Sequence, residues 1–444
     1  MFSKILIANR GEVAVRMIRA CKEMGIETVA VYSEADQNSL PVALADERIC
    51  IGSNAAADSY LNQKNIISAA LASNAEAIHP GYGFLSENPE FAALCEEKGI
   101  IFIGPDSNVL RAMGDKDNSR QLMKEIGVPV VPGTEILHDP AEAKRLAAEI
   151  GYPILVKATA GGGGKGIRVV EREEDLEHAF LAASEEAKSA FGNGDVFLEK
   201  YLTSVRHVEM QVLADAFGNI VCLGERDCSL QLNKQKVLEE TPCPVMTEDI
   251  RKRMMDAAVK AAKAANYVNA GTVEFLLAPD GNFYFIEMNT RLQVEHPITE
   301  EISDVDIVKW QIRIACQIPL DFTQEDIHLH GHSMECRINA RSTGQVDFLH
   351  IPGGSRVHFD TALVQDCLIV PFYDSMIGKL IVYAKTREDA IRKMEAALCE
   401  MVIHGIHTNI EDQLRLVRNP RFQKGDYDTL ILPELLAEGG TELE

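Results

Sequence analysis

Residues 271–289 read GTVEFLLAPDGNFYFIEMN, two runs of β-forming residues separated by Pro-Asp-Gly. Asp-Gly between two such runs is a strong signal for a hairpin with a two-residue turn. With that turn, Glu274 on the first strand faces Glu287 on the second. Asn289 follows two residues later on the same face. The other side chains of both strands are largely apolar or aromatic, so we expect this ribbon to be buried.

Two opposed carboxylates are costly inside a protein, because they repel each other and lose their water. Mg²⁺ is a hard cation that prefers carboxylate and phosphate oxygens, so it would offset this cost. The pattern therefore predicts a divalent-cation site made by Glu274, Glu287 and Asn289, for Mg²⁺ or alternatively Mn²⁺. The competing interpretation is a hairpin in another register, with the two glutamates in solvent or paired with arginine.

The composition is that of an acidic protein with room for several domains. The chain has 444 residues, of which 46% are hydrophobic, and at about 100–200 residues per domain this allows roughly two to four domains. The 44 Lys and Arg against 67 Asp and Glu give a formal net charge of -23. Such a surface repels nucleic acid. The ten cysteines show no C-x-x-C spacing, which argues against zinc, and a chain of this size needs no disulfides.

The beginning of the chain offers only a short apolar run before the polar Asn9 and Arg10. This run is too short for a signal peptide. No stretch approaches the ~18 apolar residues of a membrane span. We therefore expect a cytoplasmic protein that neither crosses a membrane nor binds nucleic acid.

Apolar strands alternate with helical patterns over the first part of the chain. Strands are expected at residues 4–8, 28–32, 77–78 and 100–103, with an amphipathic helix from 11 to 25. This alternation is typical of a doubly wound α/β domain. The first strand is followed by Asn-Arg-Gly-Glu rather than G-x-G-x-x-G, so no dinucleotide is assigned. Beyond residue 330, strands at 336–340 and 379–384 and a helix at 387–401 indicate a compact α+β domain.

Two further segments have the residue types that handle anions. Lys157 precedes ATAGGGGKG at residues 158–166, where consecutive glycines let backbone N–H groups converge on phosphate. A plain flexible loop explains this run equally well, and it is not a P-loop. In MNTRLQVEHP at residues 288–297, Arg291 offers a planar fork for a carboxylate-like anion such as bicarbonate, and Glu295 is a candidate general base. The alternative is a structural Arg–Glu pair. Arg337 lies in an apolar strand, where it needs an anionic partner.

Taken together and in this order, the segments resemble the biotin carboxylases of the ATP-grasp superfamily. The resemblance rests on IANRGE (7–12), HPGYGFLSEN (79–88), the tetraglycine loop, RHVE (206–209), ERDCS (225–229), FIEMNTR (285–291), QVEHP (293–297) and FYDSMIGK (372–379). It implies a doubly wound α/β domain at 1–114 and an ATP-grasp domain at 115–330. The mobile glycine-rich lid of the latter would cover about 130–203, and an α+β biotin carboxylase domain would follow at 331–444.

The resemblance also implies roles for individual residues, all of them expectations at this point. The nucleotide would be held by Lys116, Lys157, Gly163, Gly164, Glu199, Lys200, Leu202, His207, Gln231 and Lys234. Magnesium would be bound by Glu274, Glu287 and Asn289, and bicarbonate by Lys236, Arg291, Gln293 and the Val294 backbone. Glu295 would be the base, and Arg337 would stabilise the biotin enolate.

The chain departs from the family pattern at two positions. Lys234 stands where the family commonly has histidine, which affects a nucleotide contact. Arg341 stands where the family often has an acidic residue, and a short FLHIPGG turn follows at 348–354. Contacts around the biotin entrance are therefore expected to differ.

The resemblance implies an ATP- and Mg²⁺-dependent ligase that carboxylates biotin with bicarbonate through carboxyphosphate. This would be the first half-reaction of acetyl-CoA carboxylase in fatty acid synthesis. Because Met-Lys-Met does not occur in the sequence, the biotin carboxyl carrier protein and the carboxyltransferase are expected on other chains. A homodimer is expected. The alternatives are another ATP-grasp ligase of the carboxylate–amine type and a non-catalytic nucleotide-binding subunit.

Overall fold

A computed structural model of the chain describes residues 1–158, 167–191, 194–232, 235–432 and 434. The described chain divides into two compact units. Unit 1 comprises Met1–Val128, Arg206–Phe275 and Glu287–Glu444, and unit 2 comprises Pro129–Val205 and Leu276–Ile286. Among the described residues, every helix is too short or too polar to pass through a lipid bilayer.

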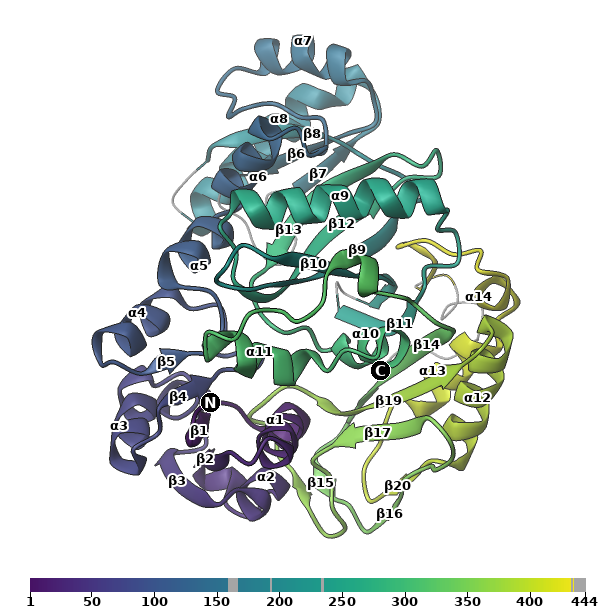
Figure 1. The fold of residues 1–444 in the computed structure, drawn as a ribbon. Helices are drawn as coiled ribbons and strands as arrows, with labels where there is room; N and C mark the ends of the chain where they lie inside the picture. The colour runs from purple at the N-terminus through teal and green to yellow at the C-terminus, as the bar shows by residue number, and fades with distance from the viewer. Residues whose placement is uncertain (159–166, 192–193, 233–234, 433, 435–444) are drawn as a thin grey trace. The chain divides into compact units, whose positions relative to one another are not determined.

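Unit 1 begins with a five-stranded parallel sheet (Figure 1). Its order is β3 (Glu47–Gly52), β2 (Glu27–Ser33), β1 (Lys4–Ile7), β4 (Ala77–His79) and β5 (Ile101–Phe102). The connecting helices are α1 (Gly11–Glu23), α2 (Leu40–Leu44), α3 (Gln63–Ser73), α4 (Pro89–Glu97), α5 (Ser107–Gly114) and α6 (Lys116–Glu125), with short 3-10 turns at Glu34–Asp36 and Ala56–Asp58. The expected strands, the first helix and the doubly wound α/β class are confirmed.

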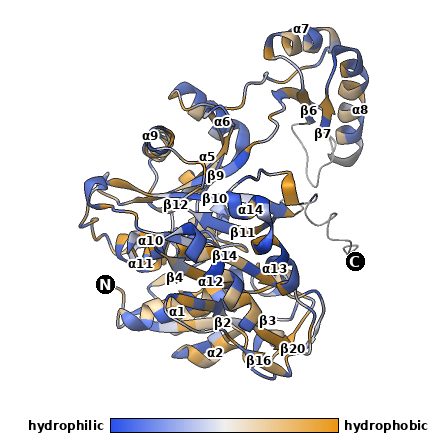
Figure 2. Ribbon diagram, turned by 90° about the vertical axis from the view of Figure 1, so that its right-hand side faces the viewer, coloured by the Kyte–Doolittle hydropathy of each residue, from blue (hydrophilic) through white to orange (hydrophobic). Residues whose placement is uncertain are grey.

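Helix α1 shows why the pattern was readable. Its apolar residues Val13, Ala14, Met17 and Ile18 recur at helical spacing and are buried against the sheet, while polar residues occupy the other face (Figure 2). Gly11 begins the helix with a positive φ of 67°, which a residue with a Cβ atom rarely adopts. The helix therefore starts immediately after the Asn-Arg turn that ends β1.

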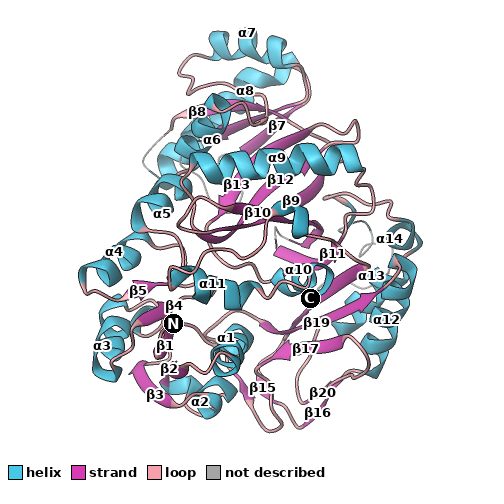
Figure 3. Cartoon of the chain, in the orientation of Figure 1, coloured by secondary structure: helices cyan, strands magenta, loops and turns pink. Residues whose placement is uncertain are grey.

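A second, eight-stranded sheet provides most of the polar residues discussed below (Figure 3). Its order is β13 (Phe283–Asn289), β12 (Asn269–Leu277), β9 (Arg206–Ala214), β10 (Ile220–Leu232), β11 (Gln235–Thr241), β14 (His332–Asn339), β19 (Met376–Ala384) and β17 (Val357–Thr361). Antiparallel pairing of β11 with β14 joins strands from both sides of residue 330 in one sheet. The strands expected at 336–340 and 379–384 correspond to β14 and β19.

The helices around this sheet and two small sheets complete unit 1. The helices are α9 (Glu248–Ala264), α10 (His296–Ser303), α11 (Ile307–Ala315), α12 (Arg387–Glu400), α13 (Ile410–Arg418) and α14 (Pro420–Lys424), with a 3-10 turn at Gln324–Asp326. The small sheets pair β15 (Gly344–Gln345) with β18 (Leu368–Ile369), and β16 (Phe348–His350) with β20 (Val402–His404). Helix α12 packs its apolar face, including Met394 and Leu398, against β14 and β19. This is the predicted α+β arrangement.

Unit 2 contains a three-stranded antiparallel sheet with two helices. Its order is β7 (Ile167–Val170), β6 (Ile154–Ala158) and β8 (Val196–Lys200), and the helices are α7 (Pro140–Ile150) and α8 (Glu173–Phe191). Apolar residues such as Ile154, Leu176 and Leu198 form a core of its own. Lys157, which precedes the glycine run, lies on β6, whereas Gly163 and Gly164 lie outside the described residues, as does Lys234.

The hairpin turn differs from the sequence prediction. Ala278 N–H donates to the Asn282 carbonyl at 2.8 Å, and Gly281 N–H donates to the Ala278 carbonyl at 3.0 Å. The turn therefore has three residues, with Pro279 in the position that proline favours and Gly281 at a positive φ of 80°. Ala278 pairs with Asn282 rather than Phe283. The expected two-residue turn was wrong, and the argument that Glu274 stands directly opposite Glu287 loses its basis.

Candidate active site

The centre of the site in unit 1 is a buried ammonium group surrounded by carboxylates. Lys236 Nζ on β11 donates to Glu209 on β9 at 2.7 Å, to Glu274 on β12 at 2.9 Å and to Glu295 at 2.7 Å. We call these four residues the Lys236 cluster. Burial alone would lower the pKa of Lys236, but the acidic groups around it outweigh burial and raise that pKa well above its usual value. Lys236 therefore carries its charge here.

Arg226 on β10 supports the cluster from one side. It stands directly opposite Glu209 in the antiparallel pair, and its Nε lies 2.5 Å from Glu209 Oε1. The guanidinium is fully buried and also donates to Gln211 and Thr299 at 2.9 and 2.8 Å. A further bond goes to Thr272 at 3.2 Å, and a buried charge is tolerated when it is paired and most of its donors are used in this way. Glu209 is thus fixed between two cations.

Glu295, the predicted base, lies immediately before α10 and is fully buried. One carboxylate oxygen accepts from Lys236 and the other accepts from Arg337 on β14 at 2.9 Å. Burial alone would raise the pKa of Glu295, but Lys236 and Arg337 hold it well below its usual range. Arg337 also donates to Glu239 at 2.6 Å, which supplies the anionic partner expected for it. The structure thus brings Lys236, Glu295 and Arg337 together.

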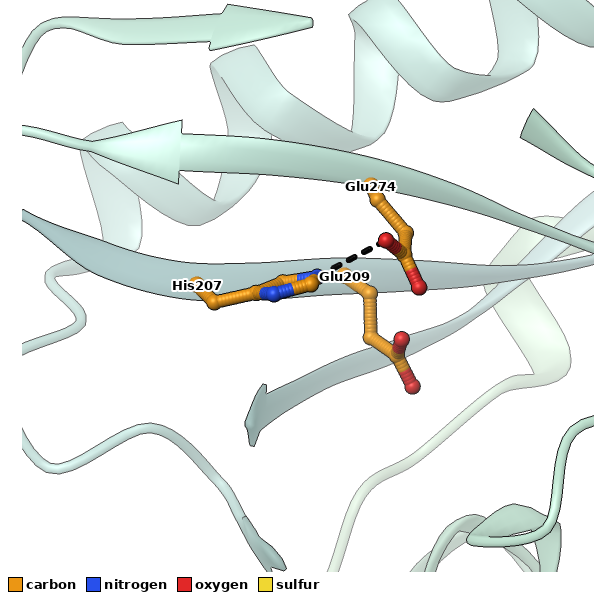
Figure 4. A group of neighbouring side chains, drawn as sticks. All are labelled: His207, Glu209 and Glu274. Atoms are coloured by element: carbon orange, nitrogen blue, oxygen red, sulfur yellow. Dashed lines mark ion pairs between the residues drawn. The ribbon is translucent and has the colours of Figure 1, made fainter. Parts of the chain in front are cut away.

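His207 and Gln231 meet at the edge of the same cluster. Gln231 Nε2 lies 2.6 Å from His207 Nδ1. His207 also approaches Glu274 (Figure 4), with Nε2 2.9 Å from Oε2. This second contact is close but is not aligned as a hydrogen bond. Burial would raise the pKa of Glu274, but Lys236 and His207 hold it well below its usual value. The ligand atoms of His207, Glu209 and Glu274 lie within 4.8 Å of one another, a spacing that suits a metal ion. In the structure, Lys236 already provides the positive charge next to the carboxylates of Glu209 and Glu274.

The loop after β13 presents the predicted anion-binding residues. Arg291 donates from Nε to Glu87 at 2.9 Å, from one terminal nitrogen to Gln293 at 3.0 Å and from the other to Asn289 at 3.0 Å. Gln293 in turn donates to Glu274 at 3.3 Å. The Arg291 side chain, 19% exposed, is therefore aligned by three neighbours and connected to the Lys236 cluster. A structural Arg–Glu pair does exist, but it joins Arg291 to Glu87 and not to Glu295.

The three predicted magnesium ligands offer only oxygen donors, as Mg²⁺ prefers. Glu274 is held by Lys236, and Asn289 Oδ1 accepts from Arg291. Glu287 pairs with Lys116 at 2.9 Å, so a predicted phosphate lysine and a predicted metal ligand are neighbours. Each of the three predicted ligands thus has an oxygen next to a cationic side chain. The residues fit a divalent ion, which would replace these cations as counter-charge.

Several of the predicted nucleotide-binding residues lie in unit 2, and their contacts are within that unit. Lys157 on β6 forms an ion pair with Glu199 on β8. Lys200 Nζ donates to the carbonyls of Gly151 and Tyr152 at 2.8 and 3.0 Å, and Leu202 is half-buried. Lys200 therefore braces the start of β6.

Sequence reasoning gave no site role to Glu209, Arg226, Glu239 or Glu87. The first two could have been found, because His207, Glu209 and Gln211 alternate along β9 and a charged Glu-Arg-Asp run follows on β10. A buried strand that alternates polar residues needs partners on the next strand. Glu239 and Glu87 carry no comparable local signal, since their partners Arg337 and Arg291 are 98 and 204 residues away.

A buried lysine among three carboxylates, an aligned arginine loop and a lysine beside a set of oxygen donors together suit small anions and a nucleotide phosphate. Such a site fits the class of ATP-dependent ligases. Comparisons with known proteins identify the family within this class. Family models match at residues 1–110 (biotin carboxylase, N-terminal domain), 115–323 (carbamoyl-phosphate synthase L chain, ATP binding domain) and 335–434 (biotin carboxylase C-terminal domain).

Curated relatives agree over nearly the full length. Biotin carboxylase 1 of Bacillus subtilis is 52% identical over 442 residues, covering 97% of this chain and 98% of that protein. A pyruvate carboxylase subunit of Methanothermobacter thermautotrophicus is 51% identical, covering 98% and 90%. The biotin carboxylase domain dimer of Hydrogenobacter thermophilus 2-oxoglutarate carboxylase, solved with MgADP, ADP and bicarbonate, is 49% identical with a TM-score of 0.90, covering 100% of both chains. The chain belongs to the biotin carboxylase family and has its fold.

Proposed function

We propose that this ligase carboxylates biotin by forming carboxyphosphate from ATP and bicarbonate at the Lys236 cluster. The observation that carries the proposal is Glu295, fully buried between the cations of Lys236 and Arg337. In the proposed reaction, bicarbonate gives its proton to Glu295 and attacks the γ-phosphate, and ADP leaves. Carboxyphosphate then breaks into CO₂ and phosphate, the phosphate takes the proton from N1′ of biotin, and N1′ of the resulting enolate forms its bond to CO₂.

The base must become stronger when the substrate binds. In the structure the two cations hold the pKa of Glu295 well below its usual range, which makes it a weak base. Bicarbonate is an anion and would compete with Glu295 for Lys236, while biotin would compete for Arg337. Each contact that Glu295 loses raises its pKa towards the value a general base needs. The cluster therefore links base strength to the presence of substrate.

Arg291, Gln293 and the Val294 backbone are the proposed bicarbonate contacts beside Lys236. Arg291 is aligned by Glu87, Asn289 and Gln293, so its fork is preorganised for a planar anion. Glu274, Glu287 and Asn289 would hold Mg²⁺, which when bound neutralises charge on the phosphates during transfer. Lys116, beside Glu287, would contact the phosphates.

The remaining proposed contacts follow the family resemblance. His207 and Gln231 would bind the nucleotide next to Glu274, and Lys157, Gly163, Gly164, Glu199, Lys200, Leu202 and Lys234 would enclose its phosphates and adenine. Arg337 would stabilise the biotin enolate. Domains at 1–114, 115–330 and 331–444 are part of the same proposal. Burial of Glu209 and Glu295 keeps water away, which supports a reaction with a hydrolysable intermediate.

For the physiological role, we propose the first half-reaction of acetyl-CoA carboxylase in fatty acid synthesis. The chain would act as a homodimer, with the biotin carrier and carboxyltransferase supplied in trans. Pyruvate or 2-oxoglutarate is the alternative final acceptor, because relatives named for those carboxylases are about as similar as those named biotin carboxylase. Rescue of a biotin carboxylase-deficient strain on medium without fatty acids would support acetyl-CoA.

The test of the activity is ADP release with bicarbonate, in the presence and absence of free biotin. We expect biotin to stimulate bicarbonate-dependent ADP release. A carboxylate–amine ligase would not respond to biotin, and a non-catalytic subunit would bind MgATP without forming ADP. Either result would overturn the proposed function.

A further inference from the structure

Lys379 on β19 is a fully buried lysine that none of the proposed substrate contacts includes. Its Nζ donates to the carbonyl oxygen of Val294 at 2.5 Å. On its other side, Nζ lies 3.5 Å from Glu12 Oε1 on α1. One ammonium group thus connects the N-terminal helix to the loop that carries the proposed bicarbonate contacts.

A buried ammonium is costly, so its neighbours indicate why it is tolerated. The carboxylate oxygens of Glu12 and Glu335 are buried, and neither group has a hydrogen-bond partner within the described parts of the chain. Burial raises the pKa of Glu335 well above its usual value, and Lys379 is the main group that opposes this rise. Lys379 therefore supplies positive charge to two incompletely paired carboxylates, but it makes its hydrogen bond to Val294.

The sheet register places Lys379 beside the reaction centre. Lys379 stands directly opposite Arg337, and Glu335 stands directly opposite Glu239 on the neighbouring strand pair. Glu335 and Arg337 are two residues apart on β14, so all four side chains occupy one face. Across the strands the register sets acid opposite acid and base opposite base, whereas along β14 the acid Glu335 and the base Arg337 follow each other. Arg337 is the member that also contacts Glu295.

The hydrogen bond to Val294 acts at a sensitive position. The Val294 carbonyl and the Glu295 N–H belong to one planar peptide group. Holding this carbonyl fixes the orientation of the peptide that leads into Glu295. An apolar residue at position 379 could not do this.

We propose that Lys379 is a positioning residue, which holds the Val294–Glu295 peptide in the orientation that binds bicarbonate. The proposal rests on the proposed function, because it assumes that bicarbonate binds at this loop. Lys379 itself contacts no substrate. Its loss changes the affinity for bicarbonate and leaves the nucleotide contacts intact.

The test is Lys379→Met, which keeps the length of the side chain and removes the charge and the donor. Loss of a charge-assisted hydrogen bond predicts an increase in KM for bicarbonate of about tenfold or more. KM for MgATP should stay within about twofold of wild type, since only the bicarbonate loop is displaced. If Lys379 were only structural, its substitution would lower the amount of active enzyme but would not raise the KM for bicarbonate relative to the KM for MgATP.

Arg387→Met is the matched control. Arg387 is also a largely buried cation that pairs with a buried carboxylate, Glu240 at 2.7 Å, and donates to the backbone carbonyls of Phe422 and Gln423, both at 2.7 Å. In the described part of the chain, its hydrogen bonds go to Glu240, Phe422 and Gln423 and none goes to residues 290–295. We expect a comparable decrease in melting temperature for both variants and an increase in bicarbonate KM only for Lys379→Met.

The wild-type protein is measured first, so that a failure of the proposed function can be distinguished from a failure of the positioning role of Lys379. No bicarbonate-dependent ADP release in wild type would overturn the proposed function. Normal wild-type activity with an unchanged bicarbonate KM in folded Lys379→Met would overturn the positioning role alone. Where Lys379→Met does not fold, Lys379→Arg is used, because its longer planar group displaces the carbonyl while keeping the charge, and the same KM increase is expected. Failure of both variants to fold would mark Lys379 as structural and overturn the proposal.

Discussion

The Lys236 cluster and the Lys116–Glu287 pair both place lysine against glutamate, yet they differ in burial. The Lys236 side chain is 11% exposed and contacts three carboxylates, whereas Lys116 is 79% exposed and contacts one. In water an ion pair contributes little, because solvent screens it and the side chains lose freedom. In the interior the same pair cannot lose a partner without leaving a buried charge. The cluster is therefore preorganised, and the exposed pair is free to exchange partners.

The largest effect is expected at Glu295, a member of the buried Lys236 cluster. Glu295→Gln removes the proposed base and leaves the buried volume unchanged, so we expect a loss of bicarbonate-dependent ADP release of at least about a thousandfold. MgATP binding, measured by calorimetry, should be retained. Substantial turnover in this variant would exclude Glu295 as the base.

The second test concerns stability at the centre of the cluster. Lys236→Met leaves three buried carboxylates without their shared cation, and we expect the free energy of unfolding to fall by about 3–5 kcal/mol. Urea denaturation at neutral pH measures this change. A decrease no larger than that of a surface substitution would mean that the cluster is hydrated and not preorganised.

A third test uses the pH dependence of stability. Burial raises the pKa of Glu12 to about 7 from an ordinary 4.5. A raised folded-state pKa gives a contribution that is complete below the ordinary value and is lost as the pH rises through 7. From this group we expect the unfolding free energy to fall by up to about 3 kcal/mol between about pH 5 and about pH 8.

Glu12→Gln should remove that part of the fall, so the variant's stability should depend less on pH than that of wild type. Urea denaturation at several pH values compares the two slopes. Equal slopes would show that Glu12 does not titrate in this range.

The smallest effect is expected at the exposed pair. Lys116→Met should change the unfolding free energy by no more than about 0.5 kcal/mol, because both side chains are solvated. It should nevertheless raise KM for MgATP by about tenfold, through loss of a phosphate contact. An equally large loss of stability at Lys116 and Lys236 would remove the distinction between the two sites.

Local patterns explain what could be predicted from the sequence. The alternation of short strands with helices such as α1 predicted the parallel sheet, and the strands near residues 336–340 and 379–384 were also found. The family motifs brought Lys236, Glu295 and Arg337 into one proposal, and the structure places them in contact. The hairpin itself was found, but its two-residue turn was predicted wrongly, because Pro279 belongs to the turn as well as Asp-Gly.

Which side chains pair with each other could not be derived from the sequence, even where the residues themselves could be suspected. Glu209 and Arg226 are only 17 residues apart, but their pairing depends on the register of β9 and β10. Lys379 and Val294 are 85 residues apart, and nothing local marks a lysine whose partner is a backbone carbonyl. The loss of water around a charged side chain depends on the assembled fold. The sequence therefore indicated that some charges would be buried, but not which partner each would have. The roles assigned to Gly163, Gly164 and Lys234 stay predictions.

The most direct measurement is the fate of oxygen from ¹⁸O-labelled bicarbonate during wild-type turnover with MgATP and biotin. Attack of a bicarbonate oxygen on the γ-phosphate predicts one labelled oxygen in the phosphate released. Phosphate whose one added oxygen comes from water would mean that ATP is simply hydrolysed, and the role assigned to the Lys236 cluster would be wrong.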